Sequence, residues 1–263
     1  MKRQVAMLLI VTYLALSTPS YAANPLVTDD TGTQGLLKFQ VETNAEFGWD
    51  WNARSGNATR SNNQSLNEVF TVGALDPLDL ALTLPFSWQH TSENGKNTSD
   101  QDGLNDISLA LKWRFLETGP TSLAIKPSIT FPSGDHNRGL GNARPAYGAT
   151  LISTMEFKPI TVSANIGYTY QYYTNSDKNT HRADLWNLSL AGTAEVMKGL
   201  QIATEVGTTS NIYKPGTDWP TFMTGGVIYS AIESLDLSLG IRVGLTPPET
   251  DISLLPGVSF KFP

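Results

Sequence analysis

The chain of 263 residues has a net charge of −6 and no cysteine, so its composition excludes a disulfide-held scaffold and argues against binding to nucleic acid. Only 16% of the residues are charged, which is below the roughly 25% usual for soluble domains. After residue 22 no run of about 18 apolar residues occurs, so no membrane-spanning helix is expected there.

The first 22 residues, MKRQVAMLLIVTYLALSTPSYA, have the organisation of a secretory signal peptide. Lys2 and Arg3 give a positive start, and the stretch from Val5 to Leu16 is apolar but too short to span a membrane. Ser20-Tyr21-Ala22 supplies small residues at the two positions that a signal peptidase reads. We therefore expect an exported protein whose mature chain begins at residue 23.

Residues 23–35 form a separate segment, which precedes the first predicted strand and is rich in turn-forming aspartate and glycine. Two interpretations remain open for it. It is either a turn-rich lead-in on the periplasmic side or a plug or gate inside a barrel, with Asp29, Asp30 and Gln34 as the candidate residues. Its carboxylates do not have the spacing of an EF-hand loop, so no metal ion is expected.

From residue 36 to the end, the chain alternates between apolar and polar residues, and a period of two is typical of strands with two unlike faces. Residues 106–115, DISLALKWRF, show the pattern most clearly, because every odd position is apolar. The alternation predicts strands over 37–51, 78–90, 106–115, 122–131, 160–172 and 235–245, and weaker ones over 66–74, 146–157, 184–197, 200–212, 221–231 and 251–262. Most are near ten residues, and a tilted strand needs about 9–11 residues to cross a bilayer.

The connections between these strands alternate in length. Long polar segments are expected at 51–65, 91–104, 133–144, 174–183 and 213–220, and tight turns at 75–77, 117–120, 158–159, 198–199 and 233–234. Short periplasmic turns and longer external loops are typical of bacterial outer-membrane barrels. We therefore predict an all-β protein, a transmembrane antiparallel up-and-down β-barrel of about 12 strands that occupies residues 36–263. The short link at 247–250 departs from the rule.

The polar faces of the strands carry mostly Ser, Thr, Asn, Gly and Ala, with sparse charges of both signs. An unpaired charge that faces lipid near the midplane costs about 2–4 kcal/mol, so the apolar faces should meet lipid and the polar faces an aqueous lumen. The lumen-lining candidates are Lys38, Glu42, Glu46, Asp106, Lys112, Arg114, Lys126, Glu156, Glu195, Glu205, Asp236 and Arg242. They form either a stiffening network of ion pairs or the selectivity lining of a channel.

Several motifs resemble a known family. They are the stretch NPLVTDDTGTQG at 24–35, Gly103-Leu104-Asn105-Asp106, the run LKWRFLE at 111–117, Pro132-Ser133-Gly134-Asp135, Arg138-Gly139-Leu140-Gly141 and Tyr147-Gly148. In this order they resemble the family labelled "putative MetA-pathway of phenol degradation", over the chain from about residue 24 to its end. The resemblance implies an outer-membrane barrel that passes small hydrophobic or aromatic compounds, and it supplies no catalytic residue.

The sequence therefore favours a non-enzymatic outer-membrane channel without a cofactor, for passive uptake or efflux of small organic solutes. The expected partners are those solutes, outer-membrane lipid and lipopolysaccharide, and the barrel-assembly machinery, since the last strand GVSFKF ends in an aromatic residue. Asp135 and Arg138 are candidates for the pore mouth, where they are expected to pair.

Three alternatives stay open. In an outer-membrane lipid esterase, His90 and Ser92 would act as base and nucleophile at the lipid-facing rim. A structural barrel would have a sealed lumen. In a soluble periplasmic β-sandwich, the apolar faces would form a core instead of meeting lipid.

Overall fold

The structure is a computed structural model that describes residues 24–54 and 57–263, so the predicted signal peptide lies outside the described residues. The strands are β1 (Phe39–Arg54), β2 (Asn57–Leu75), β3 (Leu78–Glu93), β4 (Lys96–Leu104), β5 (Ser108–Thr118), β6 (Thr121–Thr130), β7 (Ala146–Phe157), β8 (Ile160–Gln171), β9 (Asp184–Met197), β10 (Leu200–Thr209), β11 (Thr221–Ile232), β12 (Leu235–Gly244) and β13 (Ile252–Phe262). A short 3-10 helix, η2 (His136–Arg138), lies between β6 and β7. No helix in this part of the chain is long and apolar enough to span a membrane.

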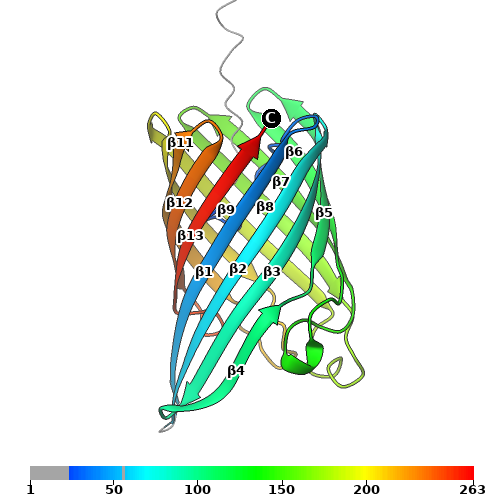
Figure 1. Ribbon diagram of the computed structural model, residues 1–263, viewed down its shortest axis with the longest axis vertical. Coiled ribbons are helices and arrows are strands. Elements are labelled where there is room, and N and C mark those ends of the chain that lie inside the picture. The colour runs from blue at the N-terminus through cyan, green and yellow to red at the C-terminus, as the bar shows by residue number, and fades with distance from the viewer. Residues whose placement is uncertain (1–23, 55–56) are drawn as a thin grey trace, which may run out of the picture.

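The strands close into an antiparallel barrel, because β1 pairs with β2 on one side and with β13 on the other (Figure 1). Strands β4 and β5 both pair with β3, at different parts of its length. Residues 78–83 of β3 pair with β5, and residues 86–93 of β3 pair with β4. The wall therefore has 12 strand positions with up-and-down topology, which confirms the predicted fold.

The two ends of the barrel differ in their connections. Five two-residue connections, at 76–77, 119–120, 158–159, 198–199 and 233–234, lie at one end of the barrel, which is called here the turn end. The opposite end, called the loop end, carries the longer segments 131–145, 172–183, 210–220 and 245–251. The C-terminus lies at the turn end (Figure 1). All five predicted tight turns and three of the predicted long loops, at 133–144, 174–183 and 213–220, are confirmed.

Two of the predicted loops are wrong. Segments 51–65 and 91–104 are mostly strand, because β1 and β2 form one long hairpin and β3 and β4 form another at the loop end (Figure 1). Their sequences are polar at nearly every position. The prediction fails because of their position. A strand that extends beyond the apolar belt has water on both faces, so the alternation of apolar and polar residues that marks a membrane strand disappears.

The faces of the barrel wall have opposite character, as β12 shows. Leu237, Leu239 and Ile241 are 41%, 48% and 51% exposed on the outer face, whereas Asp236 is 7% exposed on the inner face. The other strands repeat this arrangement, so a belt of exposed apolar side chains surrounds the barrel. A soluble monomer rarely exposes so much contiguous apolar surface, and a lipid bilayer would cover it.

Candidate functional site in the barrel lumen

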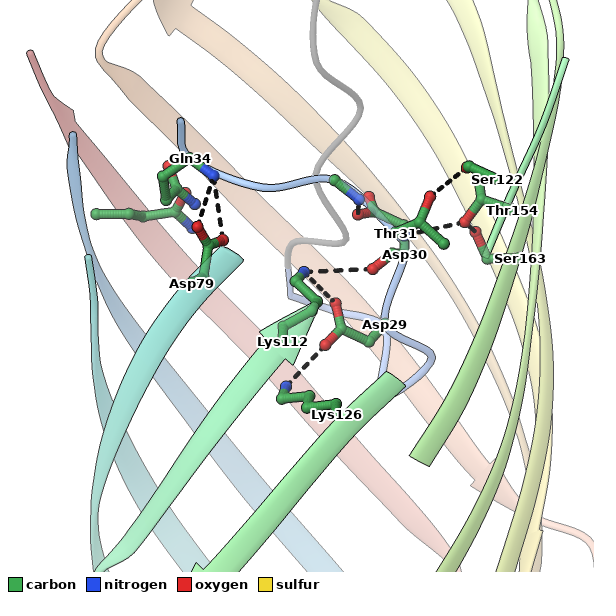
Figure 2. Close-up of polar contacts among 12 residues, drawn as sticks. Asp29, Asp30, Thr31, Gln34, Asp79, Lys112, Ser122, Lys126, Thr154 and Ser163 are labelled. Atoms are coloured by element: carbon green, nitrogen blue, oxygen red, sulfur yellow. Dashed lines mark hydrogen bonds and ion pairs between the residues drawn. The ribbon is translucent and has the colours of Figure 1, made fainter. Parts of the chain in front are cut away.

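Residues 24–36, called here the inner segment, lie inside the barrel (Figure 2). Their backbone and side chains make hydrogen bonds to side chains or carbonyl groups of nine strands: β1, β3, β5, β6, β7, β8, β9, β10 and β13. The segment then leads into β1 at the turn end, where the N–H of Leu37 donates to the carbonyl of Gly73 (2.8 Å). The polar inner face of the wall therefore serves as the binding surface for this segment.

Glu205 of β10 holds the first part of the inner segment. Its carboxylate accepts hydrogen bonds from the backbone N–H groups of Val27 (3.0 Å) and Thr28 (2.5 Å) and from the Thr28 hydroxyl (2.6 Å). The Thr28 hydroxyl is also 2.8 Å from the hydroxyl of Ser189. Because Glu205 is only 2% exposed, its carboxylate depends on these donors in place of water.

Asp29 forms the ionic centre of the inner segment, as Figure 2 shows. Its carboxylate oxygens lie 3.1 Å from the ammonium of Lys112 on β5 and 2.7 Å from that of Lys126 on β6. The Lys112 ammonium also donates to the carbonyl of Asp30 (3.2 Å). One acidic residue of the inner segment thus forms ion pairs with two cations of the wall.

The last part of the inner segment is held by neutral and acidic groups near the turn end (Figure 2). The N–H of Thr31 donates to the hydroxyl of Thr154 (3.1 Å), and the Thr31 hydroxyl contacts that of Ser122. The N–H of Gln34 donates to the carboxylate of Asp79 (3.0 Å). These contacts distribute the segment over opposite sides of the lumen.

Two contacts of the inner segment depend on shape as well as polarity. Pro25 is fully buried against the facing pair Gly226 and Gly240, and a Cβ added at Gly240 would lie 2.3 Å from the Cβ of Pro25. The side-chain amide of Asn165, in the orientation that satisfies both its atoms, accepts from the N–H of Asp29 (2.7 Å) and donates to its carbonyl (2.9 Å). The wall is thus fitted to this segment at both positions.

On the side of the inner segment that faces the loop end lies a cavity of about 170 Å³, called here the vestibule. Val27 and Asp29 of the inner segment belong to its lining, together with Lys126, Asn187 and Phe222 of the wall. A molecule that entered from the loop end would therefore meet the inner segment next.

A second group of lumen charges lies outside the inner segment. The guanidinium of Arg242 is 3.3 Å from the carboxylate of Glu46, and it stacks 4.7 Å above the ring of Phe222. At the turn end, Lys261 pairs with Asp236 at 2.6 Å. Glu42, between these groups in β1, faces the hydroxyl of Ser259 at 3.4 Å.

The remaining predicted lumen residues lie at the rims. Arg114 pairs with Glu117 (3.3 Å), and Glu195 accepts from the N–H of Gly199 (3.3 Å). Both pairs lie at the turn end. The exposed side chains of Lys38 and Glu156 lie there too. Asp106 has a different role from the predicted one. Its carboxylate accepts from the N–H groups of Gly134 (3.0 Å) and Asn142 (2.8 Å), and so it fixes the 131–145 loop in place of lining a path.

The expected pairing of Asp135 with Arg138 is wrong. The guanidinium of Arg138 lies 3.3 Å from Asp102 of β4, because the 3-10 turn directs it toward the neighbouring hairpin. Asp135 instead caps that turn, and its carboxylate accepts from the N–H of Asn137 (3.1 Å). Both residues lie at the loop end, on a connection next to the barrel opening.

The proposed esterase pair receives no geometric support. The imidazole of His90 lies 3.9 Å from the carboxylate of Asp100 across the β3–β4 hairpin, and no hydrogen bond joins it to Ser92 among the described residues. A base that activates a serine has to reach its hydroxyl within hydrogen-bond distance.

Sequence reasoning missed six wall residues whose side chains hold the inner segment. They are Gln40, Asp79, Ser122, Thr154, Asn165 and Ser189. Asp79 had a signal, because it occupies an inward position in the alternating stretch LDLALTL. The others are neutral residues of kinds that occur throughout the inner faces, so nothing in the sequence distinguished them.

Replacing Glu205 with glutamine should loosen the first part of the inner segment. The amide oxygen can keep the position that accepts from Thr28, but the NH2 would then face the N–H of Val27, and the bonds to Thr28 would lose the negative charge of their acceptor. Weakening buried hydrogen bonds in this way costs about 2 kcal/mol. Hydrogen exchange of these two amides, followed by mass spectrometry, should become roughly 30-fold faster. The matched variant Glu195→Gln, at the turn end, should leave their exchange unchanged. Equal exchange in both variants would show that Glu205 does not hold the segment.

The Asp29 ion pairs should resist acid. Burial raises the pKa of Asp29, but Lys112 and Lys126 beside it more than offset this and hold the pKa below its ordinary value. The pairing is therefore complete above the unfolded pKa of about 4, and it is lost only as pH falls through the lower folded value. The conductance of the wild type should therefore stay constant between pH 7 and pH 4. A pH-dependent change that is present in the wild type and absent in Asp29→Asn would contradict this assignment.

Comparison with known proteins agrees with this geometry. The family described as "Putative MetA-pathway of phenol degradation" matches residues 28–262. A solved structure, the COG4313 outer membrane channel from Pseudomonas putida F1, is similar at 16% identity with a TM-score of 0.70, over 89% of this chain and 98% of that one. The KdgM porin is similar at 9% identity and a TM-score of 0.57, over 85% of this chain and 99% of that one. At these identities the likenesses show the fold alone. No curated protein matches the sequence.

Proposed function

Because the chain belongs to the family described as "Putative MetA-pathway of phenol degradation", we propose that it is a bacterial outer-membrane channel that passes small organic solutes by passive diffusion. In this proposal the turn end faces the periplasm and the loop end faces the exterior, as is usual for such barrels. The direction of net flow then follows the solute gradient, so the same channel serves uptake and efflux.

The observation that carries the proposal is a row of buried polar groups on one side of the lumen. Thr224, Arg242 and Ser253 occupy paired positions on β11, β12 and β13. Thr224 and Ser253 are 0% and 1% exposed. The hydroxyls of both and the Nε of Arg242 have no hydrogen-bond partner among the described residues. Buried polar atoms rarely stay unpaired, so this row is suited to water or to a polar solute that takes its place.

The inner segment would act as the plug or gate of this channel. It contributes Val27 and Asp29 to the vestibule, and hydrogen bonds to nine strands hold it across the lumen. A path for solutes therefore runs between the inner segment and the row on β11–β13, or it opens when the segment moves. In either case the segment sets the cross-section.

The same hydrogen bonds favour a second candidate, a structural barrel with a sealed lumen. Planar-bilayer recording of the purified protein separates the two. A channel should give discrete conductance steps, and swelling of proteoliposomes should depend on solute size. Absence of both conductance and solute flux would overturn the channel and leave the sealed barrel.

The solute class can be tested in the same proteoliposomes. Stacking of Arg242 on Phe222 places an aromatic face and a cation beside the vestibule, which suits small aromatic compounds. We expect faster flux of small phenols than of aliphatic alcohols of the same size, and Phe222→Ala should reduce that ratio. An unchanged ratio would remove the aromatic preference without affecting the channel itself.

In parallel, Ser92→Ala should leave the rate of lipid-ester hydrolysis at background.

A further inference from the structure

A second cavity, of about 590 Å³, lies at the loop end on the outer side of the barrel. Tyr170 belongs to the outward row of β8 together with Ile166, and the two side chains are 37% and 53% exposed. The ring of Tyr170 meets that of Tyr172 edge-on at 4.9 Å, and both rings line the cavity. The cavity therefore opens where the apolar belt ends and the external loops begin.

Three cations line the same cavity. Lys178 and Arg182 come from the 172–183 loop, and Lys214 comes from the neighbouring 210–220 loop. Asp184 lines the cavity as well, so its lining has three positive charges and one negative charge, whereas the whole sequence has a net charge of −6. The sign of this local charge is therefore opposite to that of the protein as a whole.

Backbone contacts hold the two loops together and bring the cations close. The N–H of Arg182 donates to the carbonyl of Ile212 (2.8 Å), and the N–H of Lys214 donates to that of Thr180 (2.8 Å). The guanidinium of Arg182 donates to the carbonyls of Lys214 (3.0 Å) and Gly216 (2.9 Å), and the Lys214 ammonium contacts the carbonyl of Lys178. The cluster is thus positioned by the fold and does not consist of independent mobile side chains.

The positive charges of this cluster are only partly offset within the protein. Among the described residues, neither Lys178, Arg182 nor Lys214 forms an ion pair, although ion pairs occur elsewhere in the barrel. The two carboxylates here have other partners: Asp177 faces His136 (3.7 Å), and Asp184, which also lines the cavity, accepts from the hydroxyl of Tyr168 (2.6 Å). Three adjacent cations without anionic partners form a binding site for an anion.

We propose that this cavity binds a phosphate group of lipopolysaccharide, the phosphorylated glycolipid of the outer leaflet. Such a lipid presents anionic phosphates at the membrane surface directly above acyl chains. The cavity has the same order, with Lys178, Arg182 and Lys214 above the tyrosines and the tyrosines above the apolar belt. Basic pockets that flank the apolar surface of membrane proteins bind lipid head groups in this way, and tyrosine rings favour the interface between them.

The test is binding of lipid A to the full mature chain in detergent micelles, measured by native mass spectrometry. Lys178→Gln combined with Lys214→Gln removes two charges and keeps Arg182, which holds the loops. Affinity for bisphosphorylated lipid A should fall about 25-fold, or roughly fivefold per lysine. The pair Lys158→Gln and Lys198→Gln makes the same charge change at the turn end and should not alter affinity. Lys178→Arg with Lys214→Arg should retain binding.

Three results would overturn the proposal. One is equal affinity of the wild type and the glutamine double variant for lipid A. Another is equal binding of lipid A from which both phosphates have been removed. The third is saturation of the site by inorganic phosphate that displaces lipid A completely, since this would assign the cavity to a free anion. The arginine variant keeps the test valid if the glutamine variant folds poorly, because its charge and fold are preserved.

Discussion

Asp29→Asn should release the inner segment and raise the single-channel conductance. The substitution keeps the size of the side chain but leaves Lys112 and Lys126 without their shared carboxylate, 3.1 and 2.7 Å away. Removing one partner of a buried ion pair costs about 3–5 kcal/mol, and the partial exposure of Lys126 places the value near the lower limit. About 3 kcal/mol increases the population of the released state on the order of 100-fold.

Planar-bilayer recording measures this effect, and two variants control it. Asp218→Asn removes the same charge from an exposed loop and should leave the conductance unchanged. Asp29→Asn combined with Lys112→Met and Lys126→Met removes all three charges, so no buried cation is left unpaired, and the conductance should return toward that of the wild type. If Asp29→Asn alone conducts like the wild type, the ion pairs do not hold the segment.

Gly240→Ala should displace the inner segment by sterics alone. The new methyl group would lie 2.3 Å from the Cβ of Pro25, which is less than any van der Waals contact, and overpacking of this kind costs about 1–3 kcal/mol. The barrel wall itself is affected less, because the nearest backbone atom is the carbonyl oxygen of Gly225 at 3.4 Å. We expect a higher conductance. The shift in electrophoretic mobility between unheated and heated samples, which reports a folded barrel, should not change.

Gly225→Ala is the matched control for this prediction. Gly225 precedes Gly226 in β11, but its added methyl group would meet nothing within 4 Å, because it points away from the lumen. This variant should conduct like the wild type. Equal conductance of the Gly240→Ala and Gly225→Ala variants would mean that Pro25 is not packed against the wall in the membrane.

The wall of the barrel could be predicted from the sequence because lipid imposes a strict rule on it. Each outward position has to be apolar, so stretches such as LDLSLGIRVGL reveal both the strand and the face. The rule ends where the membrane ends, so the polar hairpins of β1–β2 and β3–β4 have the composition of loops although they are strands. Their pairing is held by backbone hydrogen bonds, which leave no period in the side chains.

The lumen could be predicted only in outline. Charge and parity placed Lys112, Lys126 and Glu205 inside, but not their partners, because the contacts join residues as far as 178 positions apart. Two interpretations of the 23–35 segment were therefore equally compatible with its sequence. A glycine facing another glycine in the next strand, such as Gly226 opposite Gly240, was the one available hint that something approaches the wall closely.

The most direct test of the account is chemical modification of Val27→Cys during single-channel recording. Val27 lies on the inner segment and lines the vestibule, and the chain has no other cysteine that would react. A bulky, membrane-impermeant thiol reagent added on the loop-end side should reduce the current in steps, because solutes pass beside this segment. Complete modification with an unchanged current would show that the path avoids the inner segment, and this would contradict the account.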